Sequence, residues 1–151
     1  MPNWCYNRIT IYGDSETEAK LKEIEEIFEK ADPFNQIFPI PDFKNIPDEK
    51  GELPKLEQKL NPDGSVFYET YNFSDGTNDD RWYHWCIQNW GTKWDACDKS
   101  VEYEDSEILA LTFNTAWSPP EGIVERLREK YPDLTFQCFY DEPGMESAGY
   151  Y

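Results

Sequence analysis

The first strand-like segment of the chain spans residues 3–12, where two kinds of side chain alternate. One set is Cys5, Asn7, Ile9 and Ile11, and the other is Trp4, Tyr6, Arg8, Thr10 and Tyr12. This alternation predicts a strand, because successive side chains of a strand point to opposite faces of a sheet. The same period predicts strands over residues 94–104, 107–117 and 134–140, with a hairpin turn near residues 105–106.

Other segments repeat their apolar side chains at helical spacing. Residues 15–31 have this spacing, and Ser15 with Glu18 forms a candidate capping box at their start. Residues 119–131 follow Ser118, a candidate N-cap, and begin with proline, which is common at the first position of a helix. A shorter helix, rich in aromatic side chains, is predicted over residues 79–90.

Without the aromatic helix, the order of these elements is strand, helix, strand, strand, helix, strand. Two β-α-β halves with right-handed crossovers predict an α+β fold: a ferredoxin-like β-α-β-β-α-β sandwich with both helices on one face of an antiparallel sheet. We expect residues 1–151 to form this single domain, with a long insertion at about residues 33–93 between the first helix and the second strand. The insertion is expected to cover the other face of the sheet or to wall a cleft.

The insertion has three parts with different patterns. Residues 34–41 end in two closely spaced prolines and predict an extended segment at an edge. Residues 42–65 contain three prolines, two glycines and few large apolar side chains, which predicts a mobile loop. Residues 66–73 are aromatic and strand-like.

Charge and composition limit the classes of function. The 151 residues include 14 Lys and Arg against 31 Asp and Glu, a formal net charge of −17. Direct binding to nucleic acid is disfavoured, because phosphate affinity comes from cationic side chains, and an anionic membrane would repel the chain for the same reason. Since the chain also carries 6 Trp, 10 Tyr and 9 Phe, we expect it to fold. With neither a basic, apolar leader nor an apolar run of membrane-spanning length, the expected location is the cytoplasm of a host cell.

The cysteines and histidine do not suggest a metal site. Cys5, Cys86, Cys97 and Cys138 are far apart in the sequence, and His84 is the only histidine. Zinc sites usually draw on closely spaced pairs of Cys or His ligands. We therefore expect free thiols, no bound metal and no cofactor.

Several blocks of the sequence share tryptophans, asparagines and prolines. They are Met1-Pro2-Asn3-Trp4-Cys5 with Asn7-Arg8, residues 82–94 including Asn89-Trp90-Gly91-Thr92-Lys93-Trp94, Phe113 to Pro120 including Ala116-Trp117-Ser118-Pro119-Pro120, Tyr131 to Phe136, and Glu142-Pro143-Gly144-Met145. In these blocks the chain resembles the YubB-like family of plasmid and phage proteins. The resemblance implies a ferredoxin-like domain and an origin in a mobile element, and it implies no established activity.

One candidate site consists of tryptophans with a few polar side chains. It comprises Trp4, Asn7, Arg8, Trp82, Asn89, Trp90, Lys93, Trp94, Asn114 and Trp117. Such rings stack on planar ligands, and an arginine or lysine beside them can meet a phosphate. A small nucleotide-like ligand, bound or sequestered in an aromatic cleft, is therefore one hypothesis. The alternative is that the indoles fill the core of a domain with few aliphatic side chains.

A second candidate site is a set of acidic side chains on the first helix, the second hairpin and the tail. It comprises Glu23, Glu26, Asp98, Glu102, Glu104, Asp105, Asp141 and Glu142. Spaced carboxylates can imitate the phosphates of nucleic acid and occupy the basic groove of a protein that binds it. The alternative is a solvated surface that keeps the protein soluble.

The preferred hypothesis is a non-enzymatic accessory protein of a phage or plasmid that binds and neutralises a host component. Its expected partner is a host protein with a basic surface, plausibly a defence protein. A hydrolase that uses paired carboxylates, such as Asp95 with Asp98 or Asp79 with Asp80, is a further alternative. Because the sequence shows no catalytic constellation, no catalytic residue is assigned.

Overall fold

The computed structural model describes residues 2–151 and forms two compact units. We call residues 2–39 and 85–151 the sheet unit, and residues 40–84 the hairpin unit. None of the helices among these described residues is both long enough and apolar enough to cross a membrane.

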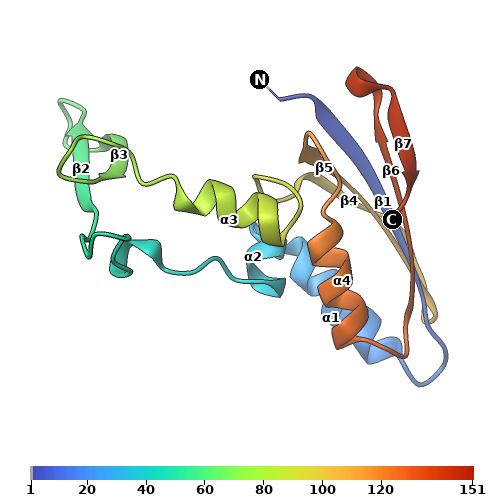
Figure 1. The fold of residues 1–151 in the computed structure, drawn as a ribbon. Helices are drawn as coiled ribbons and strands as arrows, with labels where there is room; N and C mark the ends of the chain where they lie inside the picture. The colour runs from blue at the N-terminus through green and yellow to red at the C-terminus, as the bar shows by residue number, and fades with distance from the viewer. Residues whose placement is uncertain (1) are drawn as a thin grey trace. The chain divides into compact units, whose positions relative to one another are not determined.

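The sheet unit contains an antiparallel sheet of five strands in the order β4-β5-β1-β6-β7 (Figure 1). The strands are β1 (Trp4–Tyr12), β4 (Cys97–Glu104), β5 (Ile108–Ala116), β6 (Thr135–Glu142) and β7 (Ser147–Tyr150). The first four form the antiparallel sheet of a ferredoxin-like domain. The fifth, β7, was not predicted from the sequence and pairs with the edge of β6 after a short 3₁₀ turn, η2 (Pro143–Met145).

Two long helices, α1 (Glu18–Glu29) and α4 (Glu121–Lys130), lie on the same face of this sheet (Figure 1). Their apolar side chains are buried against the inward-facing residues of β1, β5 and β6. Both helices begin later than the sequence predicted. Thr17, rather than Ser15, is the N-cap of α1, and the Ser118 hydroxyl donates to the carbonyl oxygen of Gly91 instead of capping α4.

The segment predicted to be extended at residues 34–41 starts as a short helix, α2 (Pro33–Ile37). The Asp95 carboxylate accepts hydrogen bonds from the backbone N–H groups of Phe34 (3.0 Å) and Asn35 (3.1 Å). These donors have no partner within the helix, so a carboxylate from a distant part of the sequence stabilises its first turn. The Phe34 ring packs edge-on against Phe113 of β5, with ring centroids 5.7 Å apart.

Helix α3 (Arg81–Asn89) continues from the hairpin unit into the sheet unit. At its end Trp90 is buried, and its indole N–H donates to the carbonyl oxygen of Phe38 (2.9 Å). Gly91 has a φ of +91°, and a Cβ on Gly122 would lie only 1.8 Å from the carbonyl oxygen of Asn89. The absent side chain thus lets the start of α4 approach the end of α3 closely.

Both ends of the predicted insertion therefore join the helix-covered side of the sheet. Phe34 contacts Trp90 and Phe113, and Phe113 faces the helices. The expectation that the insertion covers the opposite face is wrong for these end segments. Their aromatic side chains instead extend the core, which has few aliphatic side chains of its own.

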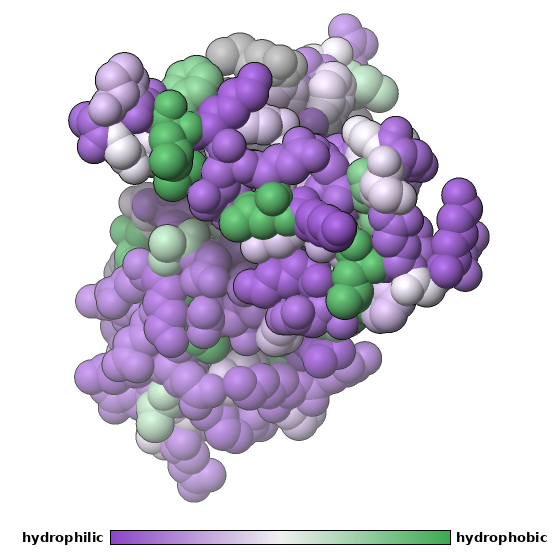
Figure 2. Space-filling model, turned by 90° about the vertical axis from the view of Figure 1, so that its left-hand side faces the viewer, coloured by the Kyte–Doolittle hydropathy of each residue, from purple (hydrophilic) through white to green (hydrophobic). Residues whose placement is uncertain are grey.

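The hairpin unit contains a 3₁₀ turn, η1 (Phe43–Asn45), and two antiparallel strands, β2 (Lys55–Leu60) and β3 (Val66–Asn72). The predicted mobile loop thus includes a strand that pairs with β3. Figure 2 views the molecule from the left-hand side of Figure 1, where the hairpin is drawn. This face has mainly hydrophilic side chains, with separate hydrophobic ones between them. Phe67 is 73% exposed, so little apolar surface is buried by the hairpin itself.

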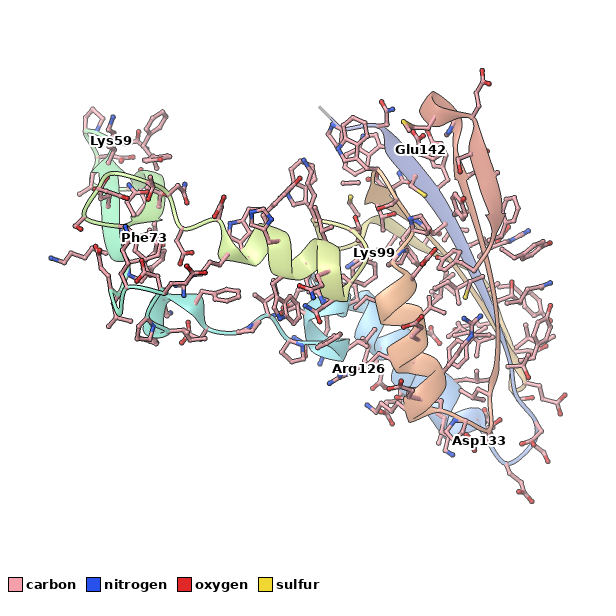
Figure 3. All side chains as sticks on the ribbon, in the orientation of Figure 1. Lys59, Phe73, Lys99, Arg126, Asp133 and Glu142 are labelled. Carbon is pink, nitrogen blue, oxygen red and sulfur yellow. The ribbon has the colours of Figure 1, made fainter. Side chains whose placement is uncertain are left out.

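One arginine holds the base of the hairpin unit together. Arg81 forms an ion pair with the buried Asp79 (2.8 Å) and donates to the carbonyl oxygen of Phe43 (2.8 Å). Its guanidinium also lies over the rings of Phe43 and Phe73, at 5.0 and 5.5 Å from their centroids, and Phe73 is labelled in Figure 3. Arg81 lowers the pKa of the Asp79 carboxyl through this hydrogen bond, so the pair stays charged at neutral pH.

Candidate functional site

The strand register assigns one set of side chains to the sheet face opposite α1 and α4, because residues paired across an antiparallel ladder point to the same side. We call this set the open face. It comprises Trp4, Tyr6, Arg8, Thr10 and Tyr12 of β1, Cys97, Ser100 and Tyr103 of β4, Ile108, Ala110, Thr112, Asn114 and Ala116 of β5, Thr135, Gln137, Phe139 and Asp141 of β6, and Ala148 and Tyr150 of β7. Both long helices lie on the other side (Figure 1).

Exposed aromatic rings are the main feature of the open face. They are Tyr6, Tyr12, Tyr103, Phe139 and Tyr150. Tyr150 is 71% exposed and Tyr6 is 52% exposed, and the rings of Phe139 and Tyr150 meet edge-on with centroids 5.2 Å apart. Exposed apolar surface on a sheet is costly in water, and large patches of it are typical of interaction sites, so this face is a candidate.

Beside Arg8 and Asp141, the open face includes Glu102, which lies at a shift in the register of β4 and reaches Arg8. Arg8 donates two hydrogen bonds to Glu102 of β4, with N···O distances of 2.8 and 2.7 Å. This bond raises the pKa of the guanidinium and lowers the pKa of the Glu102 carboxyl. Since Glu102 neutralises Arg8, the exposed Asp141 leaves the face with a net negative charge.

A hollow of about 250 Å³ lies on the open face where β1, β6 and β7 run side by side. Its lining consists of Arg8, Thr10, Gln137, Phe139 and Tyr150. The hydrogen bonds to Glu102 hold the Arg8 guanidinium toward β4, and the rings of Phe139 and Tyr150 form the aromatic part of the lining. Thr10 and Gln137 supply the polar groups.

The predicted tryptophans do not converge on one cavity. Trp90 is in the core, whereas Trp82 belongs to the hairpin unit and is 39% exposed. Trp4 and Trp94 are neighbours, with ring centroids 6.4 Å apart, and the Lys93 ammonium lies over the Trp94 ring at 4.2 Å. Trp90 therefore fills the core, as the alternative interpretation of the tryptophans expected, while Trp4 and Trp94 lie at the surface.

Trp117 also lies at this end of the sheet, directly after β5. Its φ is +71°, a left-handed conformation that is strained for a bulky residue, and its side chain is 47% exposed. Its backbone N–H donates to the carbonyl oxygen of Asn3 (2.9 Å), which holds the end of β5 to the start of β1.

The predicted asparagines have structural partners. Asn7 is buried and donates to the Thr115 hydroxyl (2.9 Å), while its side-chain oxygen accepts from the Tyr151 hydroxyl (2.9 Å). Asn89 donates to the carbonyl oxygen of Trp85 in the last turn of α3. Asn114 is the one that reaches the open face, where it donates to Asp98 (3.0 Å).

The acidic residues predicted to bind a partner do not form one continuous surface. Glu142 is 2% exposed, so it is not part of a surface, and Figure 3 labels it at the end of β6. One of its oxygens accepts from the backbone N–H of Met145 (2.6 Å), while the other has no hydrogen-bond partner among the described residues. Glu23 accepts from the Tyr131 hydroxyl (2.6 Å) and pairs with Lys130 (3.3 Å).

Three other predicted acids line a hollow between α1 and the β4–β5 turn. They are Glu26, Glu104 and Asp105, and the hollow has a volume of about 480 Å³. Glu25 lies beside them and shares a hydrogen bond with Glu104, which raises the pKa of Glu25 to about 7. Two carboxyl groups this close hold a proton between them that separate carboxylates would release.

The carboxylates considered for acid–base chemistry also have structural roles. Asp95 caps α2 and accepts from its neighbour Ala96 (2.8 Å), and burial raises the pKa of its carboxyl. Asp98 accepts from Asn114, and Asp79 is paired with Arg81.

The four thiols are free, and no cluster of three or more His, Cys, Asp or Glu that could hold a metal is found within residues 2–151. Burial raises the pKa of the thiols of Cys5, Cys86 and Cys138 to about 11. These thiols are therefore protonated at neutral pH and poor nucleophiles.

The sequence reasoning missed the aromatic residues of the open face other than Trp4. Tyr6 and Tyr12 alternate with core residues along β1, so their outward direction was visible in the pattern. Phe139 and Gln137 follow the same alternation in β6. Tyr150 gave no such signal, because β7 exists only through its pairing with β6.

The comparisons with known proteins agree with the observed fold. No curated protein matches the chain. The chain is similar to the crystal structure of the protein api92 from Yersinia pseudotuberculosis, with a TM-score of 0.53 and 12% sequence identity, over 99% of this chain and 93% of that one. At this identity the similarity shows the fold alone. The family model described as "Ferredoxin-like domain in Api92-like protein" matches residues 70–151, more than half of the chain. The chain therefore belongs to the Api92-like family and contains its ferredoxin-like domain.

Proposed function

We propose that the protein is a non-enzymatic accessory protein that binds and neutralises a host protein, and that it does so by placing a basic segment of that protein on the open face. The observation that carries this proposal is the combination of exposed aromatic rings and carboxylates on one uncovered sheet face. Cationic side chains are attracted both to ring faces and to carboxylates.

Charge complementarity supports a basic partner over other macromolecules. The net charge of −17 attracts a cationic protein over long distances and raises the rate of encounter. The same charge repels the phosphates of nucleic acid, although the aromatic rings alone would suit stacked bases. The partner is therefore expected to be a protein with exposed arginine or lysine residues.

The alternative of a small planar ligand held between tryptophans has less support. Trp90 is buried and Trp82 belongs to the other unit, so of the predicted tryptophans the half-buried Trp4 and the exposed Trp94 and Trp117 are left for it. The hydrolase alternative has no specific observation in its favour, because Asp95, Asp98 and Asp79 each have a structural partner.

The finer expectations from the sequence belong to the same proposal. They are a relation to the YubB-like proteins, an origin in a phage or plasmid, a place in the host cytoplasm, an anti-defence role, and a single domain in which about residues 33–93 are an insertion. The match to the Api92-like family supports the ferredoxin-like part of this description.

Binding to a defined basic peptide tests the proposal. The probe is a twelve-residue peptide of alternating glycine and arginine, titrated calorimetrically into the whole protein at 50 and 300 mM NaCl. A double variant of the open face, Glu102→Gln with Asp141→Asn, is compared with a double variant of α1, Glu26→Gln with Glu29→Gln. Both change the net charge by the same amount, so non-specific attraction is matched.

We expect the open-face variant to weaken binding about tenfold and the α1 variant to weaken it much less. Equal weakening by both variants would show that the peptide follows net charge rather than a site, and would contradict the proposal. A host protein recovered from lysate counts as the partner only if the α1 variant retains it and the open-face variant loses it.

A further inference from the structure

The hollow on the open face has both aromatic and polar side chains in its lining. The rings of Phe139 and Tyr150 meet edge-on there, and Arg8, Thr10 and Gln137 complete the lining. Its volume of about 250 Å³ is enough for one long side chain and too small for a helix or a strand. A single side chain of the partner is therefore the fitting occupant.

The polar groups of the hollow favour a planar group that donates hydrogen bonds. The side-chain oxygen of Gln137 has only a long hydrogen bond, from the Tyr12 hydroxyl at 3.4 Å, and retains capacity to accept another. The Thr10 hydroxyl can accept as well. None of the described residues that line the hollow is a carboxylate, so a compact and strongly hydrated ammonium would lose water there without a direct counter-charge.

A guanidinium suits these conditions better than an ammonium. It is planar, is more weakly hydrated, and stacks on aromatic rings while its edge donates hydrogen bonds. Arg8 does not exclude it, because the Arg8 guanidinium is held by Glu102 on the β4 side of β1, whereas the ring wall lies on the β6–β7 side. The carboxylates of the face supply the attraction at longer range.

We infer that the hollow is a specificity pocket for one arginine side chain of the protein partner. This inference rests on the proposed function and adds to it a choice between the two basic side chains. Arginine is among the residues that most often dominate the binding energy of interfaces, above all where it fills a pocket.

A lysine peptide of the same charge separates this inference from general attraction, and a neutral citrulline peptide shows the contribution of charge. The arginine peptide above is compared with peptides of the same length in which every arginine is replaced by lysine or by citrulline, the neutral analogue of arginine. We expect the arginine peptide to bind the whole protein about tenfold more tightly than the lysine peptide, and the citrulline peptide to bind weakly.

Two variants test whether the preference for arginine over lysine arises in the hollow. Tyr150→Ala removes a ring wall, and Gln137→Lys puts an ammonium where the guanidinium is expected. Both positions are exposed, so folding should survive, and circular dichroism verifies it. The preference for arginine over lysine should fall to below about twofold in both variants. Tyr103→Ala is the matched control, because Tyr103 is an exposed tyrosine of the same face outside the hollow, and it should keep the preference.

The outcomes are distinguishable. Equal affinity for the arginine and lysine peptides, with the open-face dependence intact, would overturn the arginine pocket and leave the proposed function standing. A preference for arginine that survives Tyr150→Ala and Gln137→Lys would also overturn it, because the selective site would lie elsewhere. Failure of both basic peptides to bind at 50 mM NaCl would overturn the proposed function itself.

Discussion

The two faces of β1 differ in burial, because alternate side chains of this strand point into the core and onto the open face. Ile9 and Ile11 are fully buried against the helices, whereas Tyr6 and Tyr12 are exposed on the open face. The difference shows that aromatic content alone does not locate a site in this chain. The direction of each side chain decides whether a ring adds to stability or remains available for binding.

The largest expected effect comes from removing a ring from the covered face. Phe113 is buried and contacts both Phe28 (5.6 Å between ring centroids) and Phe34. Phe113→Ala should lower the free energy of unfolding by about 3–5 kcal/mol, because it removes apolar contacts and leaves a cavity. Chemical denaturation followed by tryptophan fluorescence measures this change.

Tyr6→Ala provides the comparison from the opposite face and should change the free energy of unfolding by about 0.5 kcal/mol or less. A loss in Tyr6→Ala as large as that in Phe113→Ala would mean that the open face is covered in solution.

A substitution at Gly122 tests the close approach between α3 and α4 on the covered side. In Gly122→Ala the new Cβ would meet the carbonyl oxygen of Asn89, so one helix must shift. We expect a loss of about 1–3 kcal/mol in the free energy of unfolding, as for other overpacked positions. Gly149→Ala is the control, because its Cβ would make only an ordinary contact with the Tyr140 ring (3.9 Å) and its backbone has no positive φ. A neutral Gly122→Ala would contradict the described packing.

The Glu25–Glu104 pair gives stability a dependence on pH. The pKa of Glu25 is raised from 4.5 to about 7, so the folded state holds a proton that the unfolded state releases more readily. The stabilisation linked to this proton is present below pH 4.5 and is lost as the pH rises from there to about 7. Thermal melting between pH 5 and 8 should therefore show a fall in melting temperature with rising pH.

Glu104→Gln should flatten this dependence, because the like charge that raises the pKa of Glu25 is gone. The net charge of −17 also favours lower pH in general, so Glu107→Gln serves as the control for one removed charge. If both variants flatten the profile equally, the Glu25–Glu104 pair has no particular role.

The smallest effect on stability is expected for the exposed pair of Arg8 and Glu102. Both side chains lie in solvent, and ion pairs of this kind contribute little to folding. Arg8→Met should leave the melting temperature almost unchanged while it frees Glu102 for a cationic peptide. Tighter binding of the arginine peptide by this variant is the expected readout, and weaker binding would show that the Arg8 guanidinium itself contributes to binding.

The sequence predicted the strands of the ferredoxin-like sheet best, where one face is buried. Alternation in residues 107–117 predicts β5 and its two faces, because burial on one side imposes a period of two. The pattern failed where structure depends on distant partners. The Asp95 carboxylate stabilises α2, and β6 provides the edge for β7, and neither effect is visible in the local sequence.

The candidate site was less predictable than the fold for a related reason. Trp90 and Tyr150 are both large aromatic residues near a predicted element, yet the first is buried and the second is exposed. Trp90 is buried because Phe34 and Trp85 pack against its ring and Phe38 accepts from its indole N–H, and Phe34 and Phe38 are distant in the sequence. Glu142 likewise resembles the other acids of the tail in sequence, but its backbone partner in η2 holds it inside.

The distribution of the four cysteines has a practical consequence for following the two units in solution. All of them belong to the sheet unit, and the hairpin unit has none. Alkylation of the three buried thiols, Cys5, Cys86 and Cys138, therefore reports when the sheet unit opens and gives no signal from the hairpin unit. Labelling measured beside proteolysis between residues 55 and 72 would tell which of the two parts gives way first on heating.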